Sequence, residues 1–366
     1  MKMILILSPI LSNLTNFRRE LILRLLNDGY KVTLACDYEE EYDDFSQAGV
    51  KYIKVPIDRR GANPIKEFKL LFTYFKIIRK QRPDVVLTYT TKNSVYGGMA
   101  CRILKIPYII NNSGLFDPNR IGVLFGTFLN LLYRLSYSKT RCLMYQNKSE
   151  MDVLNKVLNN KVPYRLLPGS GVNLERFVPL PYPEENVTRF IMICRIQKEK
   201  GIEEYLEAAS VLKKTYDNKV EFHLLGSFDE DYRGVVVDFE KRGIVTYHEP
   251  VADVRPYLRI SHCIVNPSYH EGMSNVLLEA SASSRPCIAS NCPGCNDIVD
   301  DKVNGYLVNV KDARDLAIKI EDFYNLSYDE KITMGLRGRR KVEKEFDRNI
   351  VIDAYYDEIN KIIVSQ

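Results

Sequence analysis

Residues 263–279 read CIVNPSYHEGMSNVLLE and combine a predicted strand, a short loop and the start of a predicted helix. The segment Cys263–Asn266 is apolar, as expected of a buried strand, and Pro267 ends it because proline has no amide hydrogen to donate to a sheet. The segment Val276–Ala282 is apolar enough to be one buried face of a helix. A strand, a loop and a helix in this order form the repeating unit of a parallel α/β sheet.

Two glutamates frame this loop, because Glu271 is followed at once by Gly272 and Glu279 comes eight residues after Glu271. If the helix begins near Ser274, Glu279 lies in its second turn and faces the same side as the loop. Free amide groups at the start of a helix suit a phosphate or a polar sugar, and Glu279 is then placed to accept hydrogen bonds from a ribose diol. The alternative is that Glu271 caps the helix and Glu279 is a solvated surface charge.

The spacing of the two glutamates resembles the E-x7-E signature of the retaining glycosyltransferases of family 4, which adopt the GT-B fold. A second match lies in residues 191–202, IMICRIQKEKGI, where the family carries the Arg and Lys that hold the donor's diphosphate. The resemblance assigns that role to Arg195 and Lys200. Shorter matches follow in the family's order at Leu224–Gly226, Ser268–Gly272, Pro293–Val299 and Asn304–Val308.

The resemblance implies a complete donor site in the second half of the chain. It makes Arg195, Lys200 and Glu271 the catalytic residues, with Glu271 accepting hydroxyl groups of the donor sugar. It assigns donor binding to Gly272, Met273, Ser274, Asn275, Glu279, Gly226, Pro250 and Val251. It also implies a metal-independent reaction that uses a UDP-sugar and no cofactor.

Alternating apolar segments predict two doubly wound α/β domains of the Rossmann-like type, which is the GT-B arrangement, with ligands in the cleft between them. We expect an acceptor-side domain at 1–175, a nucleotide-sugar domain at 186–345, and a terminal helix at 346–366 that returns to the first domain. The predicted strands are Met3–Leu7, Lys31–Cys36, Lys51–Val55, Val85–Thr88, Tyr108–Asn111, Cys142–Gln146, Tyr164–Leu167, Arg189–Cys194, Glu221–Leu225, Val245–Tyr247, Cys263–Asn266, Cys287–Ala289 and Gly305–Val308. The predicted helices of the first half are Phe17–Asn27, Pro64–Lys80, Val95–Leu104, Leu124–Tyr137 and Lys148–Val157.

Charge is distributed unevenly along the 366 residues. Residues 1–172 carry 26 Lys and Arg against 14 Asp and Glu, whereas residues 173–366 carry 26 against 33. The basic residues of the predicted helix 64–80 (Lys66, Lys69, Lys76, Arg79 and Lys80) flank a helical apolar stripe of Ile65, Phe68, Leu71, Phe72, Phe75 and Ile78. The stripe either packs on the domain core or rests on an anionic membrane surface. Nucleic acid is not expected as a partner, because no nucleic-acid motif accompanies the charge.

Several other classes of protein are disfavoured. The chain has no G-x-G-x-x-G triplet, so we expect no dinucleotide cofactor. Cys292 and Cys295 form a single CxxC without a second pair or spaced histidines, so we expect no metal site. No segment is long and apolar enough to span a bilayer, which predicts a cytoplasmic protein, peripheral on the inner face of the cell membrane.

The first half is similar to family members that add hexoses or N-acetylhexosamines to polyprenyl-diphosphate-linked sugars in bacterial glycan and capsule assembly. The similarity lies in Thr90–Gly97, Asn112–Leu115 and Gly169–Phe177, and it places the loop Ser8–Arg18 on the acceptor side. It assigns the acceptor side to Asn16, Arg18, Thr91, Lys92, Asn93 and Gly114. Many relatives carry a histidine where this chain has Thr91, and all four histidines here lie in the second half.

The sequence therefore predicts a retaining transferase that moves a hexose or N-acetylhexosamine from a UDP-sugar to a lipid-linked acceptor. Two alternatives stay open. One is a sugar-nucleotide epimerase of the same fold, which needs acid and base residues of its own in the first domain. The other is a non-catalytic partner subunit that binds a sugar nucleotide.

Overall fold

The computed structural model describes residues 2–38, 45, 48–58, 63–112, 123–184 and 186–365. These residues form two compact units, and each is described by itself. The first unit contains Met1–Ser170 together with Asn349–Gln366, and the second contains Gly171–Arg348. The division falls five residues before the predicted end of the first domain, and the C-terminal segment belongs to the first unit.

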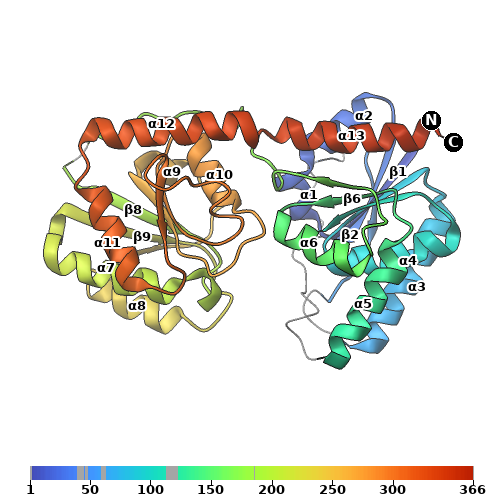
Figure 1. Cartoon of the computed structure of the whole chain (residues 1–366), viewed down its shortest axis with the longest axis horizontal. Helices are drawn as coiled ribbons and strands as arrows, with labels where there is room; N and C mark the ends of the chain where they lie inside the picture. Colours follow the sequence, from blue (N-terminus) through green and yellow to red (C-terminus); the bar gives the residue numbers. More distant parts are fainter. Residues whose placement is uncertain are drawn as a thin grey trace. The chain divides into compact units, whose positions relative to one another are not determined.

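The first unit, which contains the helices labelled α1 to α6 in Figure 1, is built on a parallel sheet whose strands lie in the order β3-β2-β1-β4-β5-β6-β7. The order reverses between β1 and β4, so the ligand-binding crevice of such a sheet is expected at the carboxyl ends of these two strands. The strand bounds are β1 Met3–Ile10, β2 Lys31–Asp37, β3 Lys51–Lys54, β4 Val85–Tyr89, β5 Tyr108–Asn112, β6 Cys142–Tyr145 and β7 Tyr164–Leu166.

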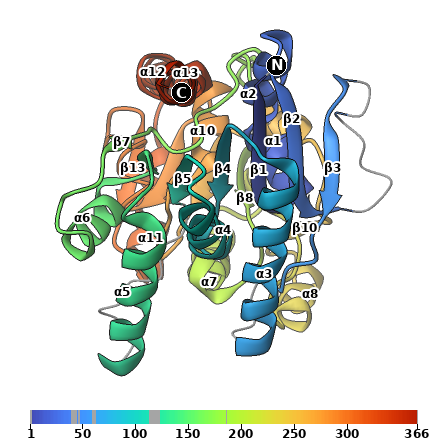
Figure 2. The same ribbon diagram turned by 90° about the vertical axis from the view of Figure 1, so that its right-hand side faces the viewer.

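Successive side chains of the central strand β1 pack on opposite faces of this sheet, as strand geometry requires. Ile4 and Ile6 belong to one core, which α1, α2 and α13 cover, while Leu5 and Leu7 belong to the other, which α3 to α6 cover. Figure 2 shows α3, α4 and α5 side by side on their face. The helices are α1 Leu11–Phe17, α2 Arg19–Asn27, α3 Pro64–Gln81, α4 Thr91–Leu104, α5 Val123–Tyr137, α6 Lys148–Val157 and α13 Arg348–Val364.

The prediction of a loop at Ser8–Arg18 was wrong. Strand β1 continues to Ile10 with a shift of register between Leu7 and Ile10, and the helix α1 follows directly. Leu11 and Leu14 are buried in this helix, so burial of apolar side chains stabilises a turn of structure that the sequence pattern did not reveal. The single helix predicted at Phe17–Asn27 is in fact two, because Arg18 separates α1 from α2.

The prediction for the apolar stripe of α3 was partly wrong. The residues of α3 that are buried are Leu70, Tyr74 and Ile78, of which only Ile78 belongs to the predicted stripe. Ile65, Phe68 and Phe72 are instead 80%, 70% and 51% exposed. Leu71 and Phe75 of the predicted stripe are partly buried and pack against the core, so only its residues Ile65, Phe68 and Phe72 are left uncovered.

The second unit is a parallel sheet of order β10-β9-β8-β11-β12-β13. Its order reverses between β8 and β11, which places the expected crevice at the carboxyl ends of these strands. The strands are β8 Thr188–Ile193, β9 Val220–Leu225, β10 Thr246–His248, β11 Cys263–Asn266, β12 Cys287–Ser290 and β13 Gly305–Val308. The helices are η3 Lys198–Lys200, α7 Ile202–Tyr216, η4 Asp217–Lys219, α8 Arg233–Lys241, α9 Arg255–Ile260, α10 Asn275–Ala282, α11 Ala313–Tyr324 and α12 Tyr328–Glu345.

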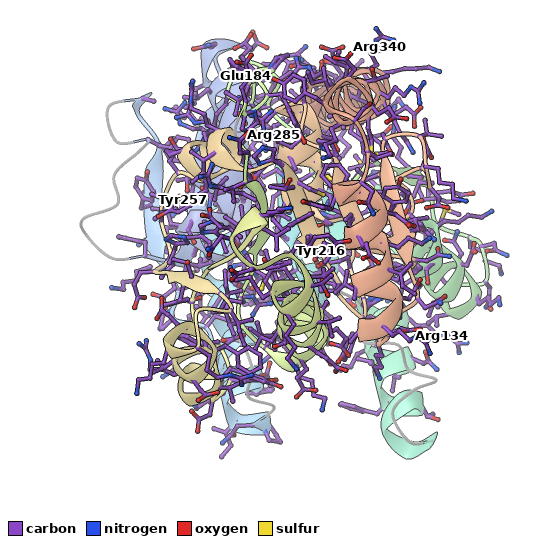
Figure 3. All side chains as sticks on the ribbon, turned by 90° about the vertical axis from the view of Figure 1, so that its left-hand side faces the viewer. Arg134, Glu184, Tyr216, Tyr257, Arg285 and Arg340 are labelled. Atoms are coloured by element: carbon purple, nitrogen blue, oxygen red, sulfur yellow. The ribbon has the colours of Figure 1, made fainter. Side chains whose placement is uncertain are left out.

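A buried arginine fixes the proline-rich segment 177–183 to the second unit. Arg285, labelled in Figure 3, is fully buried and donates to the carbonyl groups of Leu180 at 3.1 Å, Pro181 at 2.6 Å and Leu258 at 2.7 Å. Its guanidinium also lies over the ring of Tyr182, 5.5 Å from the centroid. These contacts satisfy a charge that is costly to bury otherwise, and they hold the segment against the domain.

Candidate active site

The predicted donor residues gather at the carboxyl edge of the second sheet. Lys200 follows β8, Gly226 follows β9, and Glu271 follows β11. The helices α7 and α10 both begin at this edge, so their N-terminal amide groups and the positive ends of their dipoles lie there. The edge therefore favours a negatively charged ligand.

Lys200 and Glu271 form the central ion pair of this site. The Lys200 Nζ atom donates to the Glu271 Oε1 atom at 2.6 Å, and the two side chains are only 17% and 15% exposed. Burial raises the pKa of the neighbouring Cys194 thiol to about 12. A charge held in such surroundings acts more strongly on a ligand than one in open water.

A chain of hydrogen bonds fixes the carboxylate of Glu271. The Ser268 hydroxyl donates to Glu271 Oε1 at 2.8 Å, and it lies 2.8 Å from Asn266 Oδ1. The Asn266 amide donates in turn to the hydroxyl of Ser274 at 2.8 Å. Ser274 is the residue that precedes α10, and its side chain makes no capping bond. Glu271 is thus held by the loop and is not the helix cap of the alternative interpretation.

Two glycines allow the loops of the site to approach closely. Gly201 has φ +77°, and a Cβ atom there would lie 2.2 Å from the Pro267 carbonyl oxygen. Gly294 has φ +79°, and a Cβ atom there would lie 2.8 Å from the Glu271 carbonyl oxygen. Both positions need glycine for conformation and for space, so the sequence matches at these points have a physical reason.

Arg195 does not take part in the central ion pair. Its guanidinium donates to Asp229 Oδ2 at 2.7 Å, and its side chain is 56% exposed. A guanidinium has five N–H donors, so this pair leaves others for a ligand. The structure thus pairs Lys200 with Glu271 and Arg195 with Asp229.

Glu279 lies in the second turn of α10, as the spacing predicted, and is partly buried. Desolvation raises the pKa of its carboxyl group to about 7, although the nearby charges of Arg176 and Arg348 oppose the shift. The side chain has no hydrogen-bond partner among the residues described here. A partly buried carboxylate without a partner is unlike a solvated surface charge, and it is available to a ligand's hydroxyl groups.

The other predicted donor residues follow the strands β9, β10 and β11. Gly226 has φ +151°, and a Cβ atom there would lie 1.7 Å from the Cys194 carbonyl oxygen, so no other residue fits. Pro250 and Val251 are exposed after β10, while Gly272, Met273 and Asn275 are partly buried. His270 is exposed.

On the predicted acceptor side, Arg18 is the most unusual residue. It is 4% exposed and its guanidinium lies 5.0 Å from the ring centroid of Tyr89 and 5.6 Å from that of Tyr355. Its Nη1 atom donates to the Phe17 carbonyl at 2.7 Å, but no carboxylate among the described residues pairs with it. Arg18 thus connects α13 to the end of β4.

The remaining acceptor-side residues are engaged within the first unit or exposed. Lys92 pairs with Glu67 at 2.5 Å, and buried Asn93 accepts from the Tyr74 hydroxyl at 2.6 Å. Thr91 is buried at the start of α4. Asn16 is exposed, and Gly114 lies outside the described residues.

Sequence reasoning missed several residues that contact the predicted site residues. Ser268, Asn266 and Asp229 were not predicted to contact Glu271, Ser274 or Arg195. The signal was present at Asn266, because a polar side chain that ends an otherwise apolar buried strand needs a partner. No group of three or more His, Cys, Asp or Glu side chains able to hold a metal ion occurs within the described residues. Within the same ranges, no helix is both long and apolar enough to cross a membrane.

Comparison with known proteins gives matches over both units. Residues 187–325 match the family model described as glycosyl transferases group 1, and residues 4–147 match glycosyl transferase 4-like. The chain is 26% identical, over 96% of each sequence, to N,N'-diacetylbacillosaminyl-diphospho-undecaprenol alpha-1,3-N-acetylgalactosaminyltransferase of Campylobacter jejuni. It is 23% identical, over 84% of this chain and 83% of the relative, to UDP-Gal:alpha-D-GlcNAc-diphosphoundecaprenol alpha-1,3-galactosyltransferase of Escherichia coli.

A solved structure shares the whole fold. HepE of Anabaena, in complex with UDP and glucose, superposes with a TM-score of 0.78 at 13% identity, over 99% of this chain and 100% of that one. The predicted fold class, two Rossmann-like domains in the GT-B arrangement, is confirmed.

Proposed function

This chain belongs to the group 1 and 4-like glycosyltransferases, and from that premise we propose that it moves a hexose or N-acetylhexosamine from a UDP-sugar to a polyprenyl-diphosphate-linked sugar. The names of both relatives support the proposal, since each describes transfer to a diphospho-undecaprenol sugar. The pathway served is the assembly of a bacterial surface polysaccharide or of a glycoprotein glycan.

The observation that carries the proposal is the ion pair of Lys200 and Glu271 at the switch point of the second sheet. A donor needs cations at its diphosphate, a carboxylate at its sugar hydroxyls and amide groups at its charged oxygens. Lys200, Glu271 and the N-terminus of α10 supply these in adjacent places. When a donor binds, Lys200 has two further N–H groups for phosphate oxygens while it still holds Glu271.

In the reaction we propose, the acceptor hydroxyl oxygen forms a bond to the anomeric carbon while the bond from that carbon to the phosphate oxygen breaks. The electron pair of the broken bond leaves with UDP, and Lys200 and Arg195 stabilise its charge. The hydroxyl proton passes to the departing phosphate oxygen on the same face, which retains the anomeric configuration. Side-chain cations neutralise the leaving group in this scheme, so it needs no metal ion. Glu271 orients the donor sugar, and Glu279 accepts hydrogen bonds from the ribose.

The acceptor's lipid places the reaction at a membrane surface, and the exposed face of α3 supports such a location. Lys69, Lys76, Arg79 and Lys80 are exposed and form no ion pair with a described residue. They lie on the same helix as the exposed Ile65, Phe68 and Phe72. Apolar side chains flanked by unpaired cations suit the interface of an anionic bilayer. We therefore place the protein on the cytoplasmic face of the cell membrane, where nucleotide sugars are made.

The decisive experiment incubates the pure protein with a panel of UDP-sugars and a lipid-linked acceptor extract. Release of UDP together with a heavier lipid is the expected result, and the anomeric configuration of the product tests retention. An isomerised sugar nucleotide would instead indicate an epimerase, and tight binding without turnover would indicate a partner subunit. Activity that survives treatment with a chelator is expected, and its loss would contradict metal independence.

A further inference from the structure

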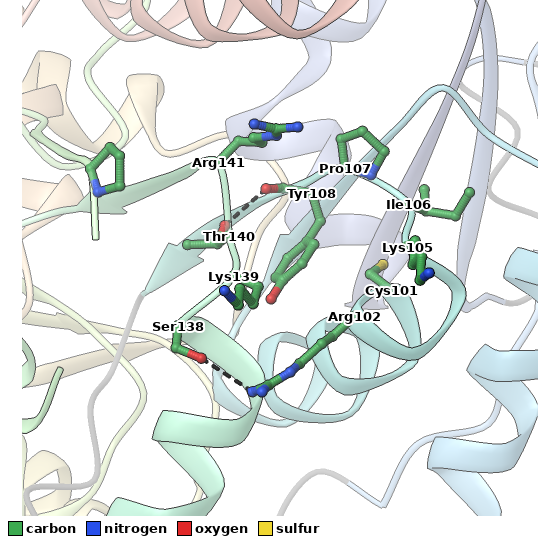
Figure 4. A pocket seen from close by; sticks show the side chains of 11 residues that line it. Cys101, Arg102, Lys105, Ile106, Pro107, Tyr108, Ser138, Lys139, Thr140 and Arg141 are labelled. Atoms are coloured by element: carbon green, nitrogen blue, oxygen red, sulfur yellow. Dashed lines mark hydrogen bonds between the residues drawn. The ribbon is translucent and has the colours of Figure 1, made fainter. Parts of the chain in front are cut away.

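A cavity of about 640 Å³ opens at the amino ends of β5, β6 and β7, the edge of the first sheet opposite its predicted ligand crevice. Its walls come from the last turn of α4, the residues that follow α5, and the residues that precede these three strands (Figure 4). The volume lies within the range of pockets that bind small molecules. Nothing in the proposed transfer reaction uses it.

Four basic side chains line this cavity, and no acidic residue does. Arg102 is held in place, because its Nη1 atom donates to the Leu135 carbonyl at 2.8 Å and to the Ser138 hydroxyl at 3.2 Å. Lys105, Lys139 and Arg141 are exposed, and none of the four cations forms an ion pair with a residue that the structure describes. Such a group of like charges repels itself until an anion binds.

The helix ends explain only part of this charge. The helices α4 and α5 both end at the cavity, and cations are favourable near a helix C-terminus. Each helix end carries about half a unit of negative charge, so the two ends balance about one of the four cations. The cavity therefore keeps a net positive charge that the protein itself does not neutralise.

Exposed apolar side chains occur on the two helices that end at the cavity. Ile103 follows the lining residue Arg102 and is 61% exposed, and Leu135, whose carbonyl Arg102 binds, is 38% exposed. On α5, Phe128 and Leu131 are 54% and 53% exposed, and with Leu135 they form a stripe at the spacing of one helix face. The cations and this stripe are complementary to the two parts of a phospholipid, its phosphate head and its apolar body.

We propose that the cavity is a second anion site, distinct from the donor site, that binds a phosphate group carried on a small organic body. The four cations provide the charge-assisted hydrogen bonds, and buried Thr140 and Tyr108 shape the floor. The ligand is either the head group of an anionic phospholipid or a soluble phosphorylated metabolite. The adjacent α5 stripe favours the lipid.

The test uses glycerol 3-phosphate as the probe and the full-length protein, with binding followed by calorimetry. The double variant Lys105→Asn, Arg141→Gln removes two of the cations. Asn is chosen at position 105 because it tolerates the left-handed backbone conformation there. We expect the dissociation constant to rise at least about tenfold, since charge-assisted hydrogen bonds to a phosphate are the strong ones. The matched control is Lys214→Gln, Lys241→Gln, which removes two exposed cations of the second unit and is expected to change nothing.

Two further measurements separate this site from the donor site and identify the ligand's source. Lys200→Ala changes the donor site in the second unit and is expected to leave glycerol 3-phosphate binding unchanged. The binding result therefore does not depend on whether the protein is a transferase. The vesicle measurement is made in a protein whose α3 already carries Lys69→Glu, Lys76→Glu and Lys80→Glu, because α3 is itself proposed to bind anionic vesicles. If adding the double variant lowers the remaining binding to phosphatidylglycerol vesicles, the source is a lipid head group; if it does not, the source is a soluble phosphate ester. The proposal is overturned if the wild-type protein does not bind glycerol 3-phosphate, or if the double variant with an unchanged melting temperature binds it equally well.

Discussion

The loop after β8 and the helix α3 both present positive charge beside a proposed ligand, but they hold it in opposite ways. At the loop, Lys200 is mostly buried, bonded to Glu271 at 2.6 Å, and surrounded by fixed hydrogen bonds. On α3, Lys69, Lys76 and Lys80 are exposed, as are Phe68 and Phe72, and the Lys76 ammonium lies 4.8 Å from the centroid of the Phe72 ring. Lys200 is thus fixed by its bond to Glu271, whereas the lysines of α3 form a patch of exposed charge.

This difference between a fixed and an exposed cation indicates which kind of ligand suits each region. A fixed, mostly buried cation stabilises a negative charge that develops at one defined position. The departing phosphate in a transfer reaction develops its charge in this way. Exposed cations act over about 8 Å at physiological ionic strength and are indifferent to the exact position of their partners, as binding to a fluid membrane requires. Mutations in the first region should therefore change turnover, and mutations in the second should change a salt-dependent affinity.

The largest effect is expected at Lys200. Lys200→Ala should lower kcat by about two to three orders of magnitude, because it removes a preorganised charge at the leaving diphosphate. The matched control is Lys198→Ala, two residues away, whose side chain is 59% exposed and, among the described residues, forms an ion pair with Glu203 alone. Steady-state kinetics with both variants test this prediction, and near-native turnover of Lys200→Ala would remove the residue from the mechanism.

The second effect concerns the membrane. Changing Lys69, Lys76 and Lys80 together to Glu should weaken binding to anionic vesicles by about a hundredfold or more, since each basic residue near such a surface contributes about 1 kcal/mol. Flotation at increasing salt measures it, and the wild-type protein should dissociate as salt rises. Lys214, Lys219 and Lys241 changed to Glu in the second unit provide the same change of charge elsewhere.

UDP-sugar binding and activity on a short-chain soluble acceptor should persist in the α3 variant, while activity on a membrane-embedded acceptor falls. Equal loss of vesicle binding in both triple variants would mean that net charge alone is responsible. Vesicle binding that does not depend on salt would contradict the role of α3.

A third prediction separates the two glutamates. Glu271→Ala should lower kcat by about ten- to a hundredfold, because its partner is the sugar that reacts. Glu279→Ala should raise the KM for the donor by about tenfold with little change in kcat, because a ribose contact is equally strong in the ground and transition states. The opposite pattern in steady-state kinetics would mean that their roles are exchanged.

The smallest effect is a pH dependence of stability at Glu279. The folded protein raises the pKa of this carboxyl group from 4.5 to about 7, so the folded state binds the proton more tightly than the unfolded state does. Glu279 therefore destabilises the fold progressively as the pH rises from about 4.5 to about 7. Without ligand, the melting temperature of Glu279→Gln should fall less over this range than that of the wild type, by a few degrees. Parallel curves for the two proteins would show that the pKa is not raised.

Much of the donor site was predictable because its groups are contiguous in the sequence. Residues 263–279 contain the strand, the loop and the first turns of the helix, so the spacing of Glu271 and Glu279 already placed both carboxylates at one edge of a sheet. The acceptor side was less predictable. Arg18 contacts Tyr89 and Tyr355, which come from segments far apart in the sequence, and no local pattern connects them.

The sequence by itself determined the class of the fold, the alternation of strands and helices, and the residue types of the donor site, because periodicity and short motifs are local properties. Only the tertiary structure decided which partners the charges take. It pairs Lys200 with Glu271, which is 71 residues away in the sequence, and Arg195 with Asp229. It also decided which part of α3 is covered, since Leu70, Tyr74 and Ile78 are buried whereas Ile65, Phe68 and Phe72 are exposed. A helical period shows that a face is apolar, but the neighbouring elements determine which face is buried.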